Sequence, residues 1–236
     1  MGRGGRGARG ASGSGLRRVS PLRRSGAATR AQTRVYAAHA DVLVAQLRGE
    51  IGAPAVPAST AALVVLMGYP GAGKSHCSRL LAGRLGAAQV ASDQLRTRLF
   101  IAPTYSDEEN GAVFRCVDGL VDGLLADGHR VIVDATNLLA RYRDASVGAA
   151  KRRDVPIVFV RVTADDGVIR DRLARRRDAR ADGDHSDADE RVYDRMRERP
   201  FEPPAEGHLE LVNGPDLDAE IERIAAEVER VCAAAI

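Results

Sequence analysis

The sequence predicts a three-layer α/β fold, in which a mostly parallel β-sheet is covered by helices on both faces. Two observations predict it. From residue 61 onward, short apolar runs alternate with longer segments whose apolar residues recur at the spacing of an α-helix. The first apolar run also passes directly into a glycine-rich stretch that precedes a helical segment. Strands and helices that alternate in this way form parallel strands joined by crossover helices.

The first elements are defined by their apolar runs and end signals. "AALVVLMG" (61–68) is a short apolar run that ends in glycine, which predicts a buried strand. Residues 74–87 carry apolar residues at helical spacing and end at Gly86, which predicts a helix with a glycine at its C-terminus. "AQVAS" (88–92) predicts the second strand.

The rest of the chain continues the same alternation. A long helix is expected to begin after Ser106, because Glu109 follows it by three residues in the pattern of a capping box. Before the sheet, a helix is expected over 35–53 and a linker over 54–60. The remaining elements are predicted as helices at 106–129, 139–153, from 165 onward, 186–200 and 216–235, and strands at 130–136, 156–164 and 208–214. Residues 61–236 therefore form one predicted domain.

Composition narrows the class of protein. The chain is 44% hydrophobic and 28% charged, which is ordinary for a soluble globular protein. No apolar run approaches the length of a membrane span. The three cysteines are scattered and odd in number, so we expect no disulfide or zinc framework and a reducing, cytoplasmic location.

The charge is distributed unevenly. Residues 1–40 contain nine Arg and no Asp or Glu, so a net charge of +3 leaves −6 on residues 41–236. The Gly- and Arg-rich segment 1–34 has too few large apolar residues to form a core, and we expect it to be disordered. Three interpretations stay open for it: a nucleic-acid-binding arm, a transit peptide and, the one we favour, an extension without function.

"GYPGAGKS" (68–75) follows the first predicted strand and matches the P-loop pattern, in which backbone N–H groups and a helix N-terminus bind phosphates. Lysine reaches the β- and γ-phosphates as a slim point charge, and the serine hydroxyl binds Mg²⁺. Lys74 is one of only two lysines in an arginine-rich chain, which supports this role. The predicted nucleotide-binding residues are Gly68, Gly71, Ala72, Gly73, Lys74 and Ser75.

Two further strand ends carry polar residues. Asp93 follows strand 88–92 and is a candidate general base, with Arg96 three residues on as a candidate acceptor-binding residue. The alternative is that Asp93 only caps a helix. Asp134 lies at the end of strand 130–136 and is, with Ser75, a candidate Mg²⁺ ligand. Asn137 is a candidate contact to the acceptor site or to a neighbouring loop. The alternative for this segment is an Asp/Thr/Asn turn without a role in binding.

Residues 169–180 contain six arginines, and an acidic, glycine-containing segment follows them. A run of charge is usually a solvated helix face. Here the arrangement is also typical of a lid that closes over phosphates and places arginine against the transferring group. Arg172 and Arg176 share one helix face, and we assign them as the lid arginines. The predicted catalytic residues are thus Lys74, Asp93, Arg172 and Arg176.

Taken together, "GYPGAGKS", "ASDQLRTRLF", "VIVDATN" and "DRLARR…SDADERVYDRMRERPFEPP" resemble the P-loop kinases of the polynucleotide-kinase and zeta-toxin type, many of which are labelled AAA family ATPase. The resemblance covers about residues 60–235 and implies a P-loop NTPase fold with an arginine-rich lid. It implies ATP and Mg²⁺ as cofactors and the site roles given above for Lys74, Ser75, Asp93 and Asp134.

The leading hypothesis is a kinase that transfers the γ-phosphoryl of ATP to a hydroxyl of a small molecule or of a nucleic-acid 5′ end, without membrane association. The rival hypothesis is a nucleotide-binding switch or slow ATPase with no acceptor. Ala135 follows Asp134 where motor-type ATPases commonly place a Glu, which favours a class other than those ATPases. The acidic balance of residues 41–236 gives little support to nucleic acid as a partner.

Overall fold

A computed structural model describes residues 40–51, 53–54, 58–101, 103, 105–178, 190–198 and 201–235. Within them, five strands form one sheet in the order β2-β3-β1-β4-β5, and every neighbouring pair is parallel. The strands are β1 (Ala62–Met67), β2 (Ala88–Ala91), β3 (Arg130–Asp134), β4 (Ile157–Thr163) and β5 (Leu209–Val212). The predicted parallel sheet is confirmed.

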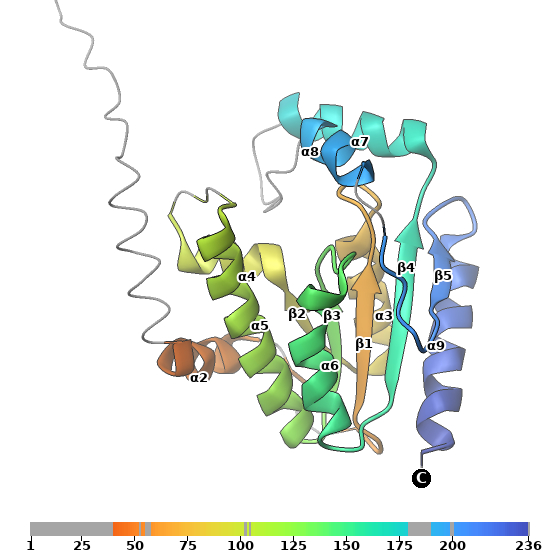
Figure 1. Cartoon of the computed structure of the whole chain (residues 1–236). Helices are drawn as coiled ribbons and strands as arrows, with labels where there is room; N and C mark the ends of the chain where they lie inside the picture. Colours follow the sequence, from red (N-terminus) through yellow and green to blue (C-terminus); the bar gives the residue numbers. More distant parts are fainter. Residues whose placement is uncertain are drawn as a thin grey trace, which may run out of the picture.

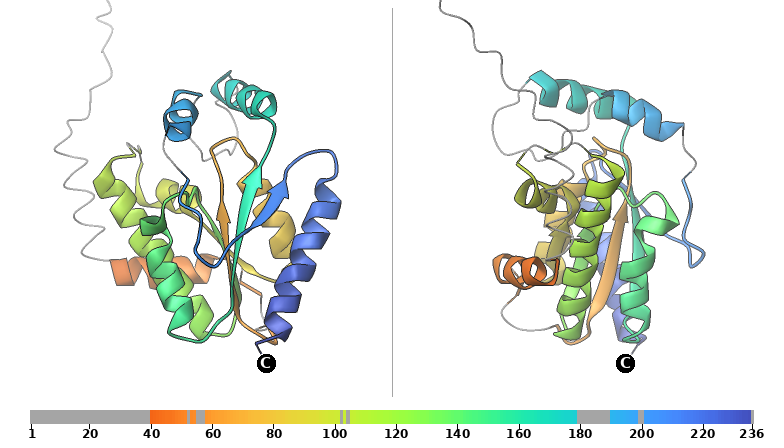
Figure 2. Two further views of the ribbon diagram at one scale, coloured as in Figure 1. Left: turned by 45° about the vertical axis from the view of Figure 1, so that its right-hand side comes forward. Right: turned by 60° about the vertical axis from the view of Figure 1, so that its left-hand side comes forward.

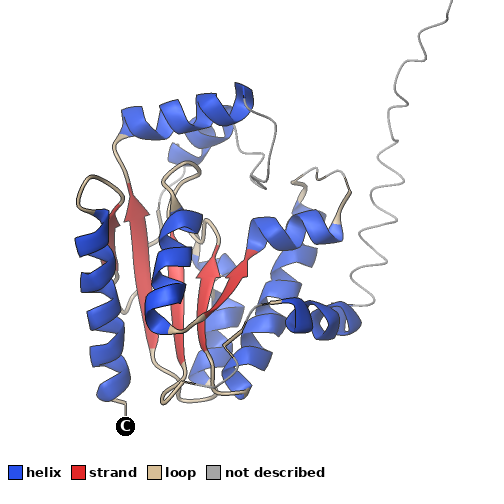
Figure 3. Ribbon diagram, turned by 180° about the vertical axis from the view of Figure 1, so that it is seen from behind, coloured by secondary structure: helices blue, strands red, loops and turns tan. Residues whose placement is uncertain are grey.

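Helices cover both faces of this sheet (Figures 1 and 3). One face carries α5 (Asp107–Ala126) and α6 (Asp144–Lys151), and α4 (Ser92–Leu99) and α2 (Ala40–Glu50) extend this layer. The other face carries α3 (Lys74–Leu85) and α9 (Leu217–Ala233). The helices α7 (Asp166–Asp178) and α8 (Glu190–Arg197) lie beyond the carboxyl ends of the strands, where Figures 1 and 2 show them above β1 and β4.

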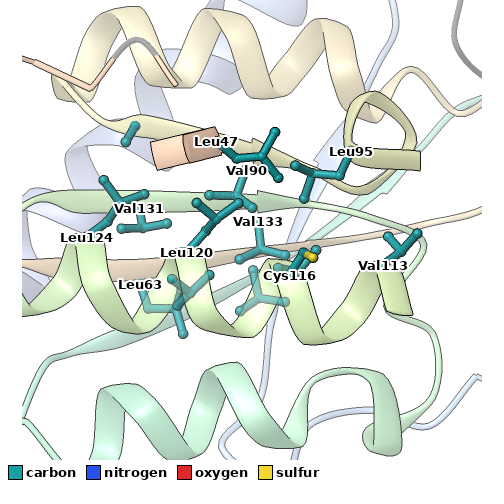
Figure 4. Packing of buried hydrophobic residues seen from close by; sticks show 14 of the residues in the cluster. Leu47, Leu63, Val90, Leu95, Val113, Cys116, Leu120, Leu124, Val131 and Val133 are labelled. Atoms are coloured by element: carbon teal, nitrogen blue, oxygen red, sulfur yellow. The ribbon is translucent and has the colours of Figure 1, made fainter. Parts of the chain in front are cut away.

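The alternation of side chains along β1 divides the core in two. Leu63, Val65 and Met67 pack against the α5 side, in the cluster that Figure 4 shows. Ala62, Val64 and Leu66 pack against α3 and α9. All six residues of β1 are buried, because both faces of a central parallel strand are covered by helices.

Several predicted boundaries hold and others shift. Ser106 accepts a hydrogen bond from the Glu109 backbone N–H at the start of α5, and Gly86 ends α3 in the left-handed conformation, both as predicted. The helix predicted over 139–153 is instead a short 3-10 helix, η1 (Ala140–Tyr142), followed by α6. None of the described helices is long and apolar enough to cross a membrane.

The N-terminal helix α2 packs on α5 at small residues. Val44 lies against Gly119, where an added Cβ would come within 2.9 Å of a Val44 methyl group, and Arg48 donates to the Gly123 carbonyl at 3.0 Å. The predicted helix 35–53 is thus present as α2 within the described residues. The segment 1–34 lies outside the described residues.

Candidate active site

The glycine-rich stretch between β1 and α3 forms a tight loop at the carboxyl edge of the sheet. Gly68, Gly71 and Gly73 all have positive φ, a conformation that favours glycine. Space also requires glycine at the start of the loop, because a Cβ on Gly68 would lie 2.5 Å from the Val162 carbonyl oxygen at the end of β4. This loop and the helix N-terminus after it have the form of a phosphate-binding site.

Lys74 and Ser75 at the end of this loop, and Asp134 at the end of β3, are of the residue types that bind phosphate and Mg²⁺. Lys74 Nζ donates to the Tyr69 backbone oxygen at 3.0 Å, so it remains at its own loop. The Asp134 carboxylate, at the end of β3, is buried and shares a hydrogen bond with the Ser75 side chain. Burial raises the pKa of Asp134, and Lys74, Ser75 and Arg79 oppose that rise.

Ser75 and Asp134 fit the ligand set of Mg²⁺. Mg²⁺ binds hard oxygen ligands and commonly takes only one or two protein groups beside substrate phosphates. The hydroxyl and the carboxylate are within hydrogen-bonding distance of each other, and Lys74 stands next to them as a countercharge for phosphate. The predicted metal ligands are therefore brought together.

Strand register places Asp93 at the same edge. Ala91 at the end of β2 pairs with Asp134, and Asp134 pairs with Leu66 of β1. Asp93 follows Ala91 by two residues, and β2 lies two strands from β1, which corresponds to about 10 Å between these strands. The helix α4 begins at Ser92, and its N-cap position is Ala91. Asp93 is not the N-cap residue but lies in the first turn, a position at which a carboxylate also interacts favourably with the helix dipole.

The two candidate acceptor residues are both buried. Arg96 donates to Asn110 Oδ1 at 2.7 Å and lies over the Tyr105 ring, and its Nε and Nη1 have no hydrogen-bond partner within the described residues. Asn137 has a φ of 47° and donates through Nδ2 to the Leu66 backbone oxygen at 2.8 Å. Asn137 therefore joins the loop after β3 to the end of β1, as the neighbouring-loop alternative expects.

The structure describes the side chain of one of the two predicted lid arginines, Arg172. Arg172 Nη1 lies 3.4 Å from the Gly71 carbonyl oxygen, so this side chain contacts the P-loop directly. Behind it, α7 packs closely on the loop, because a Cβ on Gly71 would come within 2.9 Å of Ile169 Cγ2. The side chain of Arg176 lies outside the described residues.

Sequence reasoning missed Arg170, which joins the two lid helices. Its guanidinium donates to Asp166 of its own helix and to Glu190 and Asp194 of α8, at 2.9, 2.7 and 2.8 Å. Tyr193 of α8 donates to Asp166 at 2.7 Å, and its ring meets the Tyr69 ring of the P-loop edge-on, with centroids 5.8 Å apart. The i,i+4 spacing of Asp166 and Arg170 was the one sequence signal for this network.

The comparisons with known proteins agree with this arrangement. A family model described as an AAA domain matches residues 63–204. No curated protein matches the sequence.

Several solved structures resemble the fold. One is Kti12 of Chaetomium thermophilum in complex with ADP-AlF3, with 19% identity, a TM-score of 0.60, and coverage of 72% of this chain and 98% of that chain. Another is the APS kinase CysC of Mycobacterium tuberculosis in complex with AMPPNP and APS, with 22% identity, a TM-score of 0.53, and coverage of 74% and 99%. A third is a gluconokinase of Sinorhizobium meliloti 1021, with 18% identity, a TM-score of 0.53, and coverage of 73% and 94%. At these identities, the likeness concerns the fold alone, which is an α/β fold of the P-loop NTPase type. Since the family model covers more than half of the residues, this chain belongs to the AAA domain family that it describes.

Proposed function

We propose that the protein is a Mg²⁺- and ATP-dependent kinase that transfers the γ-phosphoryl group to an alcohol. The observation that carries the proposal is the placement of Asp93 at the same sheet edge as Lys74, Ser75 and Asp134, in a helix that it does not cap. A switch or ATPase needs Lys74, Ser75 and Asp134 but does not need a carboxylate at the end of the neighbouring strand β2.

In the proposed reaction, Asp93 accepts the proton of the acceptor hydroxyl while the acceptor oxygen forms a bond to the γ-phosphorus. The bond between that phosphorus and the β,γ-bridging oxygen breaks, and ADP leaves with the electron pair. Lys74 and Arg172 stabilise the charge that develops on the phosphoryl oxygens. Mg²⁺ held by Ser75 and Asp134 would neutralise charge on the β- and γ-phosphates.

The acceptor that we favour is a small molecule. The structural neighbours include proteins titled sugar kinase and gluconokinase, whose names imply sugar-type acceptors. Residues 41–236 carry −6, which disfavours the phosphate backbone of a nucleic acid. A 5′-hydroxyl end, as in the polynucleotide-kinase type, is the second acceptor class in this proposal. Free, buried cysteines fit the cytoplasmic location that we propose.

One observation favours the rival function, a nucleotide-binding switch. Arg96 and Asn137 are buried and engaged with neighbouring segments, so the acceptor residues predicted from sequence have other contacts in this structure. The acceptor screen that separates the two functions uses γ-labelled ATP with hydroxyl-bearing metabolites and 5′-hydroxyl oligonucleotides. A kinase transfers label to one acceptor class, whereas a switch or slow ATPase releases label only as inorganic phosphate.

A further inference from the structure

The outer side of the P-loop is held by two donors from distant parts of the chain. Asn213 Nδ2 donates to the Ala72 carbonyl oxygen at 2.8 Å, and the Asn213 side chain is buried, with 7% of its residue surface exposed. Arg172 Nη1 donates to the Gly71 carbonyl oxygen at 3.4 Å. Two consecutive carbonyl groups of the loop are thus occupied by side chains from the lid and from the end of β5.

These contacts fix the direction of the loop's N–H groups. In a planar trans peptide unit, the C=O and the N–H point in opposite directions. The Ala72 carbonyl shares its peptide unit with the Gly73 N–H, and the Gly71 carbonyl shares its unit with the Ala72 N–H. Because Asn213 holds the Ala72 oxygen, the Gly73 N–H faces away from this donor, as a phosphate-binding loop requires. The Ala72 N–H instead donates to the Tyr69 oxygen within the loop, at 3.2 Å.

The fold places Asn213 rigidly. Its backbone N–H donates to the Thr163 oxygen at 2.7 Å and so continues the β4–β5 pairing by one residue. Its side chain then crosses the end of β4 to reach the loop that follows β1. A Cβ on Gly73 would lie 1.9 Å from Asn213 Nδ2, so the amide occupies the space that any side chain at position 73 would need.

We infer that Asn213 is a positioning residue for phosphate binding, which orients the Gly73 N–H through the Ala72 carbonyl without touching the nucleotide. Arg172 holds the preceding carbonyl group, that of Gly71, through a longer contact. The inference rests on the proposed nucleotide-binding function and extends it to a residue 141 positions from its partner. The shorter distance and deeper burial identify Asn213 as the stronger of the two contacts.

The test compares the native chain with Asn213→Ala and Asn213→Asp. Asn213→Ala removes the donor. Asn213→Asp keeps the shape and places an acceptor oxygen against the Ala72 carbonyl, with a negative charge close to the phosphate site. The control is Val212→Thr, which changes an exposed, adjacent side chain of the same strand. The Kd for MgADP is measured by calorimetry, the thermal midpoint is recorded for each variant, and ¹⁵N-resolved NMR follows the Gly73 amide.

The inference predicts a Kd for MgADP about tenfold higher in Asn213→Ala and higher still in Asn213→Asp, with Val212→Thr unchanged. The Gly73 amide resonance shifts on addition of MgADP in the native chain and shifts less in Asn213→Ala, a readout that a general loss of stability does not produce. If both Asn213 variants lose thermal stability but bind MgADP within twofold of the native chain, Asn213 is only structural and the inference is overturned. A native chain that binds no MgADP overturns the proposed function, and the inference with it.

Discussion

Arg96 Nη1 lies 3.5 Å from Glu109 Oε2, and the two side chains are 5% and 0% exposed. The pair joins α4, which carries Asp93, to the first turn of α5. The same guanidinium lies 4.3 Å from the centroid of the Tyr105 ring, and Glu109 accepts the Tyr105 backbone N–H at 2.9 Å. Arg96, which the sequence pattern assigns to acceptor binding, therefore also holds α4, the helix that carries the candidate base Asp93, against α5.

Arg96→Met should destabilise the fold, because it leaves the Glu109 carboxylate buried without its cation. We expect the free energy of unfolding in urea to fall by about 3–5 kcal/mol. The double variant Arg96→Met/Glu109→Gln should recover part of this loss, since no uncompensated charge remains. Arg115→Met, at an exposed position of α5, serves as the control. A fall below about 1 kcal/mol together with a raised acceptor KM would assign Arg96 to acceptor binding alone.

Lys74→Ala should weaken nucleotide binding and leave the fold intact. The lysine contributes a charged hydrogen bond to the phosphates, which corresponds to a loss of affinity of roughly 10- to 100-fold. Its amine donates to the Tyr69 backbone oxygen of its own loop, and the residue is not part of the hydrophobic core, so the thermal midpoint should change little. Lys151→Ala, which changes the chain's other lysine at an exposed ion pair, should bind MgATP like the native chain. Native affinity in Lys74→Ala would refute the P-loop assignment.

Asp134→Asn should separate stability from metal binding. Burial raises the pKa of Asp134, so folding disfavours its charged form, and this unfavourable contribution grows as pH rises from the ordinary value of 3.8 through the folded pKa. At neutral pH without Mg²⁺, the variant should be as stable as the native chain or more stable. Its Mg²⁺-dependent gain in ATP affinity should disappear. The control is Asp118→Asn, because Asp118 is a partly buried carboxylate that also has a raised pKa and accepts a hydrogen bond from a serine, Ser146.

The pH dependence of the native chain gives a second readout of the same carboxylate. Mg²⁺ binds the ionised form, so Mg²⁺-dependent nucleotide affinity should fall as the pH is lowered and Asp134 becomes protonated. An Asp134→Asn variant that keeps its Mg²⁺ response would exclude Asp134 as a ligand.

Deleting residues 1–34 should leave folding and nucleotide binding unchanged, because this segment lacks core-forming residues. Deleting residues 1–50 should instead lower the free energy of unfolding by about 2 kcal/mol, since it removes the buried Leu47 and the contact of Val44 with α5. Thermal unfolding of both truncated chains checks the pair. A large drop in the midpoint for the shorter deletion would contradict the prediction that 1–34 is disordered.

Much of the fold could be predicted because its signals are local. The apolar run of β1, the glycines of the P-loop and the Ser106–Glu109 cap each depend on neighbouring residues in sequence. The meeting of Asp93 and Asp134 at one edge followed from the rule that carboxyl ends of parallel strands lie together.

The remaining features depend on contacts between distant residues. Arg143 lies where the predicted helix 139–153 divides into η1 and α6, and its buried guanidinium donates to the backbone oxygens of Asn137 and Glu202, at 2.6 and 2.7 Å. The contact of Asn213 with Ala72 spans 141 residues, and no periodicity indicates it. The burial of Arg96 could not be predicted from the sequence for the same reason, since its partners Glu109 and Asn110 lie on another helix.

The most direct test of the account is phosphotransfer by Asp93→Asn, measured with γ-labelled ATP and the acceptor that the screen identifies. Asparagine keeps the size and polarity of the residue and removes the base. The account predicts a fall in transfer rate of roughly 10²–10⁴-fold, with an unchanged Kd for MgATP. Full phosphotransfer by Asp93→Asn would contradict the kinase mechanism, as would a native chain that labels no acceptor and releases only inorganic phosphate.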